Sequence, residues 1–301
     1  MIFNLGSINA DYFYDLPRLV KPGETLSAKG FASGLGGKGA NQSVAAALAG
    51  AEVRHIGAVG SDGDWAVQCL RDFGVDVRHV RHSDLPTAHA IVMVDGHGEN
   101  QIVVYPGANM DQSTDAIAQA LGDGRPGDWL ILQNETSHQV EAAALARRIG
   151  MHVAYSAAPF EVDAIQKMIP HATILIMNSV EAQQFKGATG AEIKSLAADH
   201  VLITRGGDGA DLHALREGRT VSVPAFAVET VDTTGAGDTF TGYLIAGLSQ
   251  GKSAELALRF ASAAAALSTT KKGTADAIPD LAEVRDFLSS QDANGALDPQ
   301  S

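Results

Sequence analysis

Short apolar runs alternate with alanine-rich segments along most of the chain. Runs of four Val, Ile, Leu and similar residues, such as 129–132, 174–177 and 201–204, have the length of buried strands. Segments between them, such as 139–148, repeat apolar residues at helical spacing. This alternation predicts βαβ units, and therefore an α/β fold with a doubly wound, mostly parallel sheet flanked by helices.

Two stretches, 12–33 and 87–105, break this rhythm with strand-like alternation and no helix between the strands. The turn residues 95–99 predict a hairpin between strands at 90–94 and 101–105. We therefore expect one α/β domain, residues 1–301, carrying a small antiparallel β lid formed by about 10–34 and 84–106. Such an insertion would lie near the carboxyl ends of the parallel strands, where ligands bind. An ordinary edge extension or a dimer surface are the alternatives.

The composition narrows the class of partner. There are 22 Lys and Arg against 35 Asp and Glu among 301 residues, a formal net charge of −13. This balance disfavours nucleic acid and anionic membranes, so small-molecule partners are expected. Cys69 is the single cysteine, no signal-peptide pattern follows Met1, and no apolar run spans a bilayer, which together predict a cytoplasmic protein. A short polar tail after Ser289 is expected to fray.

Residues 231–242 run from a strand-like segment through a glycine turn into an apolar helix. Gly235 and Gly237 permit unusual backbone angles, so the N–H groups from Gly235 to Asp238 can converge on an anion at the helix start. A carboxylate there is suited to accept a proton from an attacking hydroxyl, which makes Asp238 the candidate base. The alternative is that Asp238 caps the helix and the glycines only form a turn.

A second glycine turn, 36–41, opens the alanine-rich helix expected at 38–48. Its glycines let a ligand approach the backbone, while Lys38 and Asn41 project from the first helical turn. Gly34, Gly36 and Gly39 also match the dinucleotide-binding pattern Gly-x-Gly-x-x-Gly. We reject that interpretation because the preceding strand belongs to the lid and not to an opening βα unit.

Polar side chains follow several predicted strands. Asn9 and Asp11 follow the first strand, and Glu135 follows the run at 129–132, so they share the rim where a polyhydroxylated ligand needs acceptors. Solvated loop residues are the alternative. Asn178 and Glu181 follow 174–177 and either begin a helix or hold water on Mg²⁺. The glycine-rich segment 204–209 is at least a turn.

Motifs at 6–11, 22–25, 36–42, 178–181, 231–240 and 272–273 resemble, in order and spacing, those of the ribokinase-like (PfkB) carbohydrate kinases. The resemblance extends from the first strand to about Leu288. It implies ATP-dependent transfer of a phosphoryl group to the 5-hydroxyl of D-ribose, with Mg²⁺ and a monovalent cation such as K⁺, in a homodimer formed through the lid.

The resemblance also implies a role for each matching residue. Asp238 is the base, and Gly235, Ala236 and Gly237 stabilise the transferred group. The sugar site consists of Asn9, Asp11, Gly37, Lys38, Asn41 and Glu135. The nucleotide and Mg²⁺ site consists of Asn178, Glu181, Thr204, Gly206 and Gly237, with Glu181 acting on Mg²⁺ through water. The monovalent cation site consists of Asp232, Thr234, and carbonyls around Ser268 and Gly273.

The chain departs from the family pattern at three places. Ser156 begins Ser-Ala-Ala-Pro where the family often has Asn-Pro-Ala-Pro, Arg205 replaces an apolar residue, and Ala277 replaces a polar residue near the cation loop.

Three rival functions stay open. A related kinase for deoxyribose, a ketohexose or a nucleoside would share the phosphotransfer residues. The two rivals from different classes of protein are a nicotinamide-dependent oxidoreductase and a non-catalytic sugar or nucleotide sensor.

Overall fold

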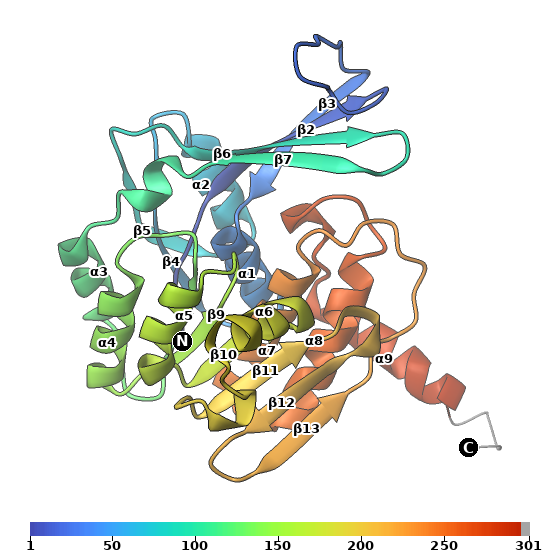
Figure 1. Ribbon diagram of the computed structural model, residues 1–301. Coiled ribbons are helices and arrows are strands. Elements are labelled where there is room, and N and C mark those ends of the chain that lie inside the picture. The colour runs from blue at the N-terminus through green and yellow to red at the C-terminus, as the bar shows by residue number, and fades with distance from the viewer. Residues whose placement is uncertain (296–301) are drawn as a thin grey trace.

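Strands and helices alternate along the chain, as the apolar runs predict. Nine of the strands form one large sheet (Figure 1). The computed structural model describes residues 1–295. The strand order is β13-β12-β11-β10-β9-β8-β1-β4-β5. The strands are β1 (Ile2–Leu5), β4 (Val53–Val59), β5 (Asp76–His82), β8 (Trp129–Gln133), β9 (His152–Ser156), β10 (Ile174–Asn178), β11 (His200–Thr204), β12 (Ala210–Ala214) and β13 (Arg219–Val223).

The sheet is parallel from β5 to β11, and β12 and β13 continue it in antiparallel pairing. The chain adds β4 and β5 on one side of β1, then returns to add β8, β9, β10 and β11 on the other side. The order therefore reverses between β1 and β8. In open α/β sheets, ligands bind beyond the carboxyl ends of the strands at this switch point.

Helices cover both faces, so the doubly wound prediction is confirmed. One face carries α1 (Lys38–Leu48), α2 (Asp64–Asp72), α7 (Ala236–Ser249), α8 (Ala254–Ser268) and α9 (Leu281–Gly295), and the other carries α3 (Thr114–Leu121), α4 (Gln139–Ile149), α5 (Val162–Met168) and α6 (Ser179–Thr189). Leu130 and Leu132 enter the core under α3 to α6, while Ile131 enters the other core. This alternation is the period of two that a strand imposes.

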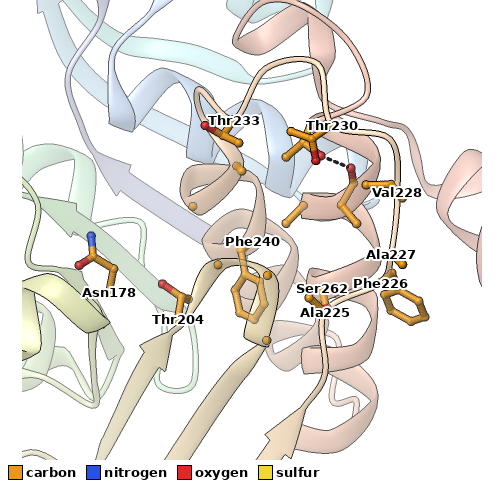
Figure 2. Close-up of a pocket in the computed structure, with 18 residues that line it drawn as sticks. Asn178, Thr204, Ala225, Phe226, Ala227, Val228, Thr230, Thr233, Phe240 and Ser262 are labelled. Atoms are coloured by element: carbon orange, nitrogen blue, oxygen red, sulfur yellow. Dashed lines mark hydrogen bonds between the residues drawn. The ribbon is translucent and has the colours of Figure 1, made fainter. Parts of the chain in front are cut away.

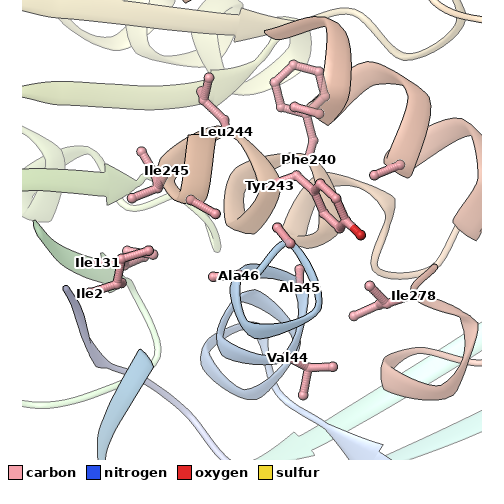
Figure 3. Close-up of a cluster of buried hydrophobic side chains, with 14 of the residues drawn as sticks. Ile2, Val44, Ala45, Ala46, Ile131, Phe240, Tyr243, Leu244, Ile245 and Ile278 are labelled. Atoms are coloured by element: carbon pink, nitrogen blue, oxygen red, sulfur yellow. The ribbon is translucent and has the colours of Figure 1, made fainter. Parts of the chain in front are cut away.

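Two helices rich in small residues, α1 and α7, pack directly on each other (Figure 3). Ala45 and Ala46 lie on the side of α1 that faces α7, and they and Tyr243 of α7 are fully or almost fully buried. A Cβ atom at Gly242 would lie 2.5 Å from the Cβ of Ala45 and 2.6 Å from the main-chain oxygen of Gln42. The absence of a side chain at Gly242 therefore permits this close approach of the two helices.

A smaller sheet stands beyond the carboxyl ends of the large one (Figure 1). Its order is β3-β2-β6-β7, with β2 (Asn9–Leu16), β3 (Gly30–Gly36), β6 (Ala88–Asp95) and β7 (Asn100–Tyr105). The pairs β2/β3 and β6/β7 are antiparallel as expected, and β6/β7 is the predicted hairpin. The central pair β2/β6 is parallel. Because β2 follows β1 and β3 leads into α1, this sheet adjoins the switch point.

The last helix corrects one expectation. The polar tail was expected to fray after Ser289, but α9 continues through Gly295. The remainder of that tail, 296–301, lies outside the described residues. Within residues 1–295, no helix is both long and apolar enough to cross a bilayer.

We predict that the contact between α1 and α7 will not tolerate one added methyl group. Gly242→Ala should lower the free energy of unfolding by about 2 kcal/mol, because both atoms facing the new Cβ belong to rigid helical positions. The matched control is Gly187→Ala in α6, where a Cβ meets nothing within 4 Å. That change should be stabilising by about 0.5 kcal/mol or more through helix propensity. Urea unfolding measures both values, and equal effects at the two sites would contradict this account.

Candidate active site

The first turn of α7 presents a carboxylate and open main-chain N–H groups at the switch point. Gly235 precedes the helix with a φ of 74°, a left-handed conformation that favours glycine. No side chain among residues 1–295 caps this end of the helix. The Ala236 N–H donates to the Thr233 main-chain carbonyl at 3.3 Å. The N–H groups of Gly237 and Asp238 lie in the first turn, where no intrahelical acceptor exists. The turn can therefore donate to an anion.

Asp238 does not cap its helix. Its side chain is only 9% exposed and turns toward α1. The Gln42 Nε2 group donates to Asp238 Oδ1 at 2.8 Å, and the Asn41 Nδ2 group makes a longer contact of 3.4 Å with Oδ2. The capping alternative considered for Asp238 is therefore not what the structure shows.

The first turn of α1 is tied to the ends of β1 and β8. Glu135 Oε2 accepts a hydrogen bond from the Lys38 N–H at 3.1 Å and another from the Ser7 hydroxyl. Ser7 Oγ also accepts the Gly39 N–H at 3.1 Å. Gly37 makes this close approach possible with a φ of 91°. Glu135 thus holds the glycine turn in place with one of its oxygens.

Four carboxylates lie within electrostatic range of the Lys38 ammonium group. The charge of Asp238 does most to raise the pKa of Lys38, and Glu135, Glu181 and Asp11 add to it against the opposing effect of burial. Burial, with the neighbouring Glu135 charge, raises the pKa of Asp11 to about 6. Burial is also the main cause of the raised pKa of Glu135 and of Glu181. The structure therefore brings together side chains from β2, α1, α6, α7 and the loop after β8.

Two buried acceptors in this cluster have no hydrogen-bond partner among the described residues, Asp11 Oδ1 and Asn41 Oδ1. The Asp11 carboxylate lies against Gly36, where any Cβ atom would be 1.9 Å from Oδ2. A buried polar atom without a partner is costly unless a ligand satisfies it. Hydroxyl groups of a bound ligand would supply the missing donors. Asn9, also buried, is held by the Asn109 amide at 2.8 Å.

A cavity of about 570 Å³ has Ala236 and Gly237 of the same turn of α7 in its lining, but not Asp238 (Figure 2). Its lining includes five residues predicted from sequence: Asn178, Thr204, Gly206, Ala236 and Gly237. Figure 2 shows Asn178 and Thr204 on one side and Phe226 and Ser262 on the other. No sequence pattern indicated the second wall, which includes Phe226, Val228, Phe240, Ser262, Ala265 and Ala266. Small and apolar side chains carry no motif that distinguishes a pocket wall from a core.

Asn178 and Glu181 form a capping box at the start of α6. Asn178 Oδ1 accepts the Glu181 N–H, and Glu181 Oε2 accepts the Asn178 N–H, both at 2.8 Å. The helix-start interpretation of these two residues therefore holds. It leaves Glu181 Oε1 and the Asn178 Nδ2 group free of the box, beside the charged cluster and the cavity respectively.

The Asp232 carboxylate fastens the turn before α7. Asp232 Oδ1 accepts the Thr234 N–H at 2.9 Å and its hydroxyl at 2.7 Å, and Oδ2 accepts the Gly273 N–H at 3.3 Å. Partial burial alone would raise the pKa of Asp232, but the hydrogen bonds from Thr234 and Gly273 lower it. The Ser268 hydroxyl donates to the Ala265 carbonyl within its own helix, at 2.9 Å. The predicted cation residues are thus close neighbours in one loop region, although the Ser268 hydroxyl is turned back.

Comparison with known proteins gives matches over nearly the whole chain. The model of the family described as pfkB family carbohydrate kinase matches residues 1–281. The ribokinase of Haemophilus influenzae is 36% identical over 299 residues, covering 94% of this chain and 97% of that protein. A deoxyribokinase of Salmonella typhi is 29% identical over 300 residues, covering 95% and 97%. Among solved structures, an Arabidopsis thaliana ribokinase complexed with ribose and ATP gives a TM-score of 0.84 with 31% identity, covering 95% and 98%.

The raised pKa of Asp11 predicts a measurable dependence of stability on pH. The folded protein keeps the Asp11 proton up to about pH 6, whereas the unfolded chain loses it near 3.8. Stability contributed by protonated Asp11 is therefore present at low pH and lost as pH rises from about 4 to 6. Asp11→Asn should remove that loss and raise the free energy of unfolding at pH 7.5 by about 1–3 kcal/mol.

Urea unfolding between pH 4 and pH 8 checks this expectation for the wild type and for Asp11→Asn. The difference between the two proteins should grow across the stated window and then stay constant. A difference that shrinks as pH rises would show that Asp11 is stabilised as a carboxylate in the folded state.

Proposed function

Because this chain belongs to the pfkB family of carbohydrate kinases, we propose that it transfers the γ-phosphoryl group of ATP to the 5-hydroxyl of D-ribose, giving ribose 5-phosphate and ADP. One observation carries the proposal. The first turn of α7 is shared by the charged cluster around Asp238 and by the cavity that begins at Ala236 and Gly237. A sugar on one side and a nucleotide on the other would meet at that turn, and ribokinases are the relatives with highest identity described above.

In the proposed reaction Asp238 takes the proton of the 5-hydroxyl while its oxygen attacks the γ-phosphorus atom. The bond from the γ-phosphorus to the bridging oxygen breaks, and ADP leaves with that electron pair. Asp238 later releases the proton to solvent. The N–H groups at the start of α7 and the Lys38 ammonium group face negative charge that spreads over the transferred group. Such a reaction is catalysed mainly by positioning and electrostatics.

The sugar hydroxyls are assigned to the unpartnered acceptors of the cluster. Asp11 Oδ1 and Asn41 Oδ1 accept from ring hydroxyls, and Gly37 and the Lys38 ammonium group donate to them. Asn41 then joins sugar and base, because its Nδ2 group contacts Asp238. Asn9 and Glu135 complete the pocket through the Asn9 Nδ2 group and Glu135 Oε1, because Asn9 Oδ1 and Glu135 Oε2 already have protein partners.

Mg²⁺ is assigned to the side of the site where Glu181 and Asn178 lie. Glu181 Oε1 is outside the capping box, and its carboxylate lies within the electrostatic reach of Lys38 and Asp238. A carboxylate and an amide are suitable partners for the water shell that Mg²⁺ keeps in nucleotide sites. When bound, the ion would neutralise charge on the phosphates. Thr204 and Gly206 are assigned to the nucleotide, since both line the cavity.

A monovalent cation such as K⁺ is assigned to the loop of Asp232, Thr234, Ser268 and Gly273. The lowered pKa of Asp232 keeps this carboxylate ionised. The hydrogen bonds from the Thr234 and Gly273 N–H groups leave part of the carboxylate free. Main-chain carbonyls near Ser268 and Gly273 would supply the remaining ligands. A cation there would fix the turn before Gly235 without touching the sugar.

The small sheet is assigned two roles, as a lid over the sugar and as the contact of a homodimer. Asp11 and Gly36 both belong to it, so its position bears on sugar access. Its outer strand β7 is exposed along its length, including Ile102, Val103 and Val104 at 55–59%. A flat, apolar edge strand is a template for pairing with another chain. The cytoplasm is the proposed location, because a chain whose single cysteine is Cys69 forms no intrachain disulfide.

ADP release over a panel of acceptors tests the proposed activity. With ATP and Mg²⁺, ribose should give the highest kcat/KM, ahead of 2-deoxyribose, fructose and adenosine, and potassium should raise the rate. Preference for another acceptor would reassign the substrate within the same family. No acceptor-dependent ADP release would leave a binding protein as the better interpretation.

Asp238→Asn is the isosteric control for that assay. It should lower kcat by about 100-fold or more while ribose binding persists, because it removes the proton acceptor and keeps the side-chain shape. Ribose affinity is measured separately by calorimetry. Turnover near the wild-type rate would remove Asp238 from its assigned role.

We predict that a charge on the β7 edge prevents self-association. The wild type should sediment at twice the chain mass, and Val103→Lys should sediment as a monomer, because a buried unpaired charge is costly at an apolar interface. Leu256→Lys, on the exposed face of α8, is the control and should not change the mass. An unchanged mass for Val103→Lys would exclude β7 from the interface.

A further inference from the structure

A continuous row of buried polar side chains leads away from Asp238 into the core between α1 and the large sheet. Its members are fully buried, each with 0% exposure: Gln42, Gln133, Asn4, Ser43 and His55. Gln42 is the one member of the row that contacts Asp238, so the other four can act on Asp238 only through Gln42. Buried polar groups are retained in a core only when hydrogen bonds satisfy them, which makes the direction of each bond informative.

The direction is set at Asn4. Its Nδ2 group donates to the Gly39 carbonyl and to Ser43 Oγ, both at 2.8 Å. Since a carbonyl can only accept, the nitrogen of this amide must face Gly39, and its oxygen must face the opposite way. Asn4 Oδ1 therefore faces Gln133, which must present a donor.

Because Gln133 must present its nitrogen to Asn4, it also determines the orientation of the Gln42 side-chain amide. The Gln133 Nε2 group donates to Asn4 Oδ1 at 2.9 Å and to Gln42 Oε1 at 2.8 Å. With its oxygen occupied in this way, Gln42 presents its Nε2 group to Asp238 Oδ1. If Gln42 were reversed, its nitrogen would face the Gln133 nitrogen, and its oxygen would face a carboxylate.

The other end of the row agrees with this direction. Burial lowers the pKa of His55 to about 4, so its ring is neutral at physiological pH. His55 Nε2 lies 3.1 Å from the Gly6 carbonyl and must donate to it, which leaves Nδ1 as an acceptor. Ser43, whose oxygen accepts from Asn4, donates its proton to that Nδ1 atom at 2.8 Å. Two main-chain carbonyls, of Gly39 and Gly6, thus set the direction of each hydrogen bond in the row, while the buried Gln133 Oε1 atom has no partner among the described residues.

We propose that Gln42 is a positioning residue for Asp238, held by this directional row so that its N–H group always occupies Asp238 Oδ1. The proposal rests on the function assigned to Asp238 above. Asn41 makes only a 3.4 Å contact with Oδ2, so Oδ2 is the oxygen left to accept the proton of the sugar hydroxyl. The other charges that face Asp238 are Lys38 on α1, Asp11 on β2, Glu135 after β8 and Glu181 on α6.

Kinetics of Gln42→Met and Gln133→Met test the proposal in the full-length enzyme. Gln42→Met should lower kcat by about 10-fold and change KM for ribose by less than about 2-fold, because the side chain reaches the base and not the sugar. In a plot of kcat against pH, the acid limb of Gln42→Met should lie about one pH unit higher than that of the wild type. The reason is that a carboxylate that loses a donated hydrogen bond holds its proton more tightly. Gln133→Met, which leaves Gln42 in place but free to reverse, should shift the limb in the same direction.

Gln112→Met is the matched control. Gln112 is another buried glutamine, 8% exposed, whose Nε2 group donates to the Asn109 carbonyl at 3.2 Å and has no contact with Asp238. Its replacement should cost stability in urea unfolding without moving the acid limb. A shift equal to that of Gln42→Met would show that the effect follows general destabilisation, and would overturn the proposal.

An NMR measurement separates this proposal from the proposed function and does not require activity. In protein labelled with ¹⁵N-glutamine, the Gln42 side-chain amide, assigned by its absence in Gln42→Met, should exchange slowly with water and change its shift in Asp238→Asn. Fast exchange and no change would overturn the positioning role, even in an active enzyme. A protected, Asp238-sensitive amide in a protein that phosphorylates no sugar would support the geometry and reject the function.

Discussion

The close approach of α7 to α1 at the switch point is the constraint on which the site depends. Gly242 lets α7 approach the Ala45 methyl group and the Gln42 carbonyl of α1 closely, and this contact brings the first turn of α7 beside the first turn of α1. Asp238 then lies within hydrogen-bond reach of Gln42. The glycine turn before α1 is held in turn by Glu135 and Ser7, at the ends of the two strands between which the order reverses. Packing in the core and placement of the site are therefore the same feature.

The electrostatics of the cluster explain why it is suited to a charged ligand. The half-buried Lys38 lies within electrostatic range of four carboxylates, and burial raises the pKa of three of them, Asp11, Glu135 and Glu181. Crowded carboxylates with unpartnered oxygens weaken the folded state, and functional sites commonly retain such costs. Hydroxyl donors from a ligand would satisfy the acceptors, and the open N–H groups of α7 provide the positive potential that a phosphoryl group requires.

Much of this arrangement follows from the sequence because its signals are local. Apolar period predicted the large sheet, and glycine turns predicted the starts of α1 and α7. The parallel pairing of β2 with β6 joins strands about 80 residues apart, so no local pattern indicates it. The wall formed by Phe226 and Val228 was missed because apolar side chains appear identical in a core and in a pocket. The role of Gln42 was missed because its partner Gln133 is brought near only by the fold.

The central claim is that Asp238 stands between a pentose and the terminal phosphate of a nucleotide. A crystal structure of this chain with ribose and a non-hydrolysable ATP analogue tests it most directly. The account predicts Asp238 Oδ2 at about 3 Å from the ribose 5-hydroxyl, with that hydroxyl in line with the γ-phosphorus atom. A ribose bound with another hydroxyl toward Asp238, or a nucleotide outside the cavity that begins at Gly237, would contradict it.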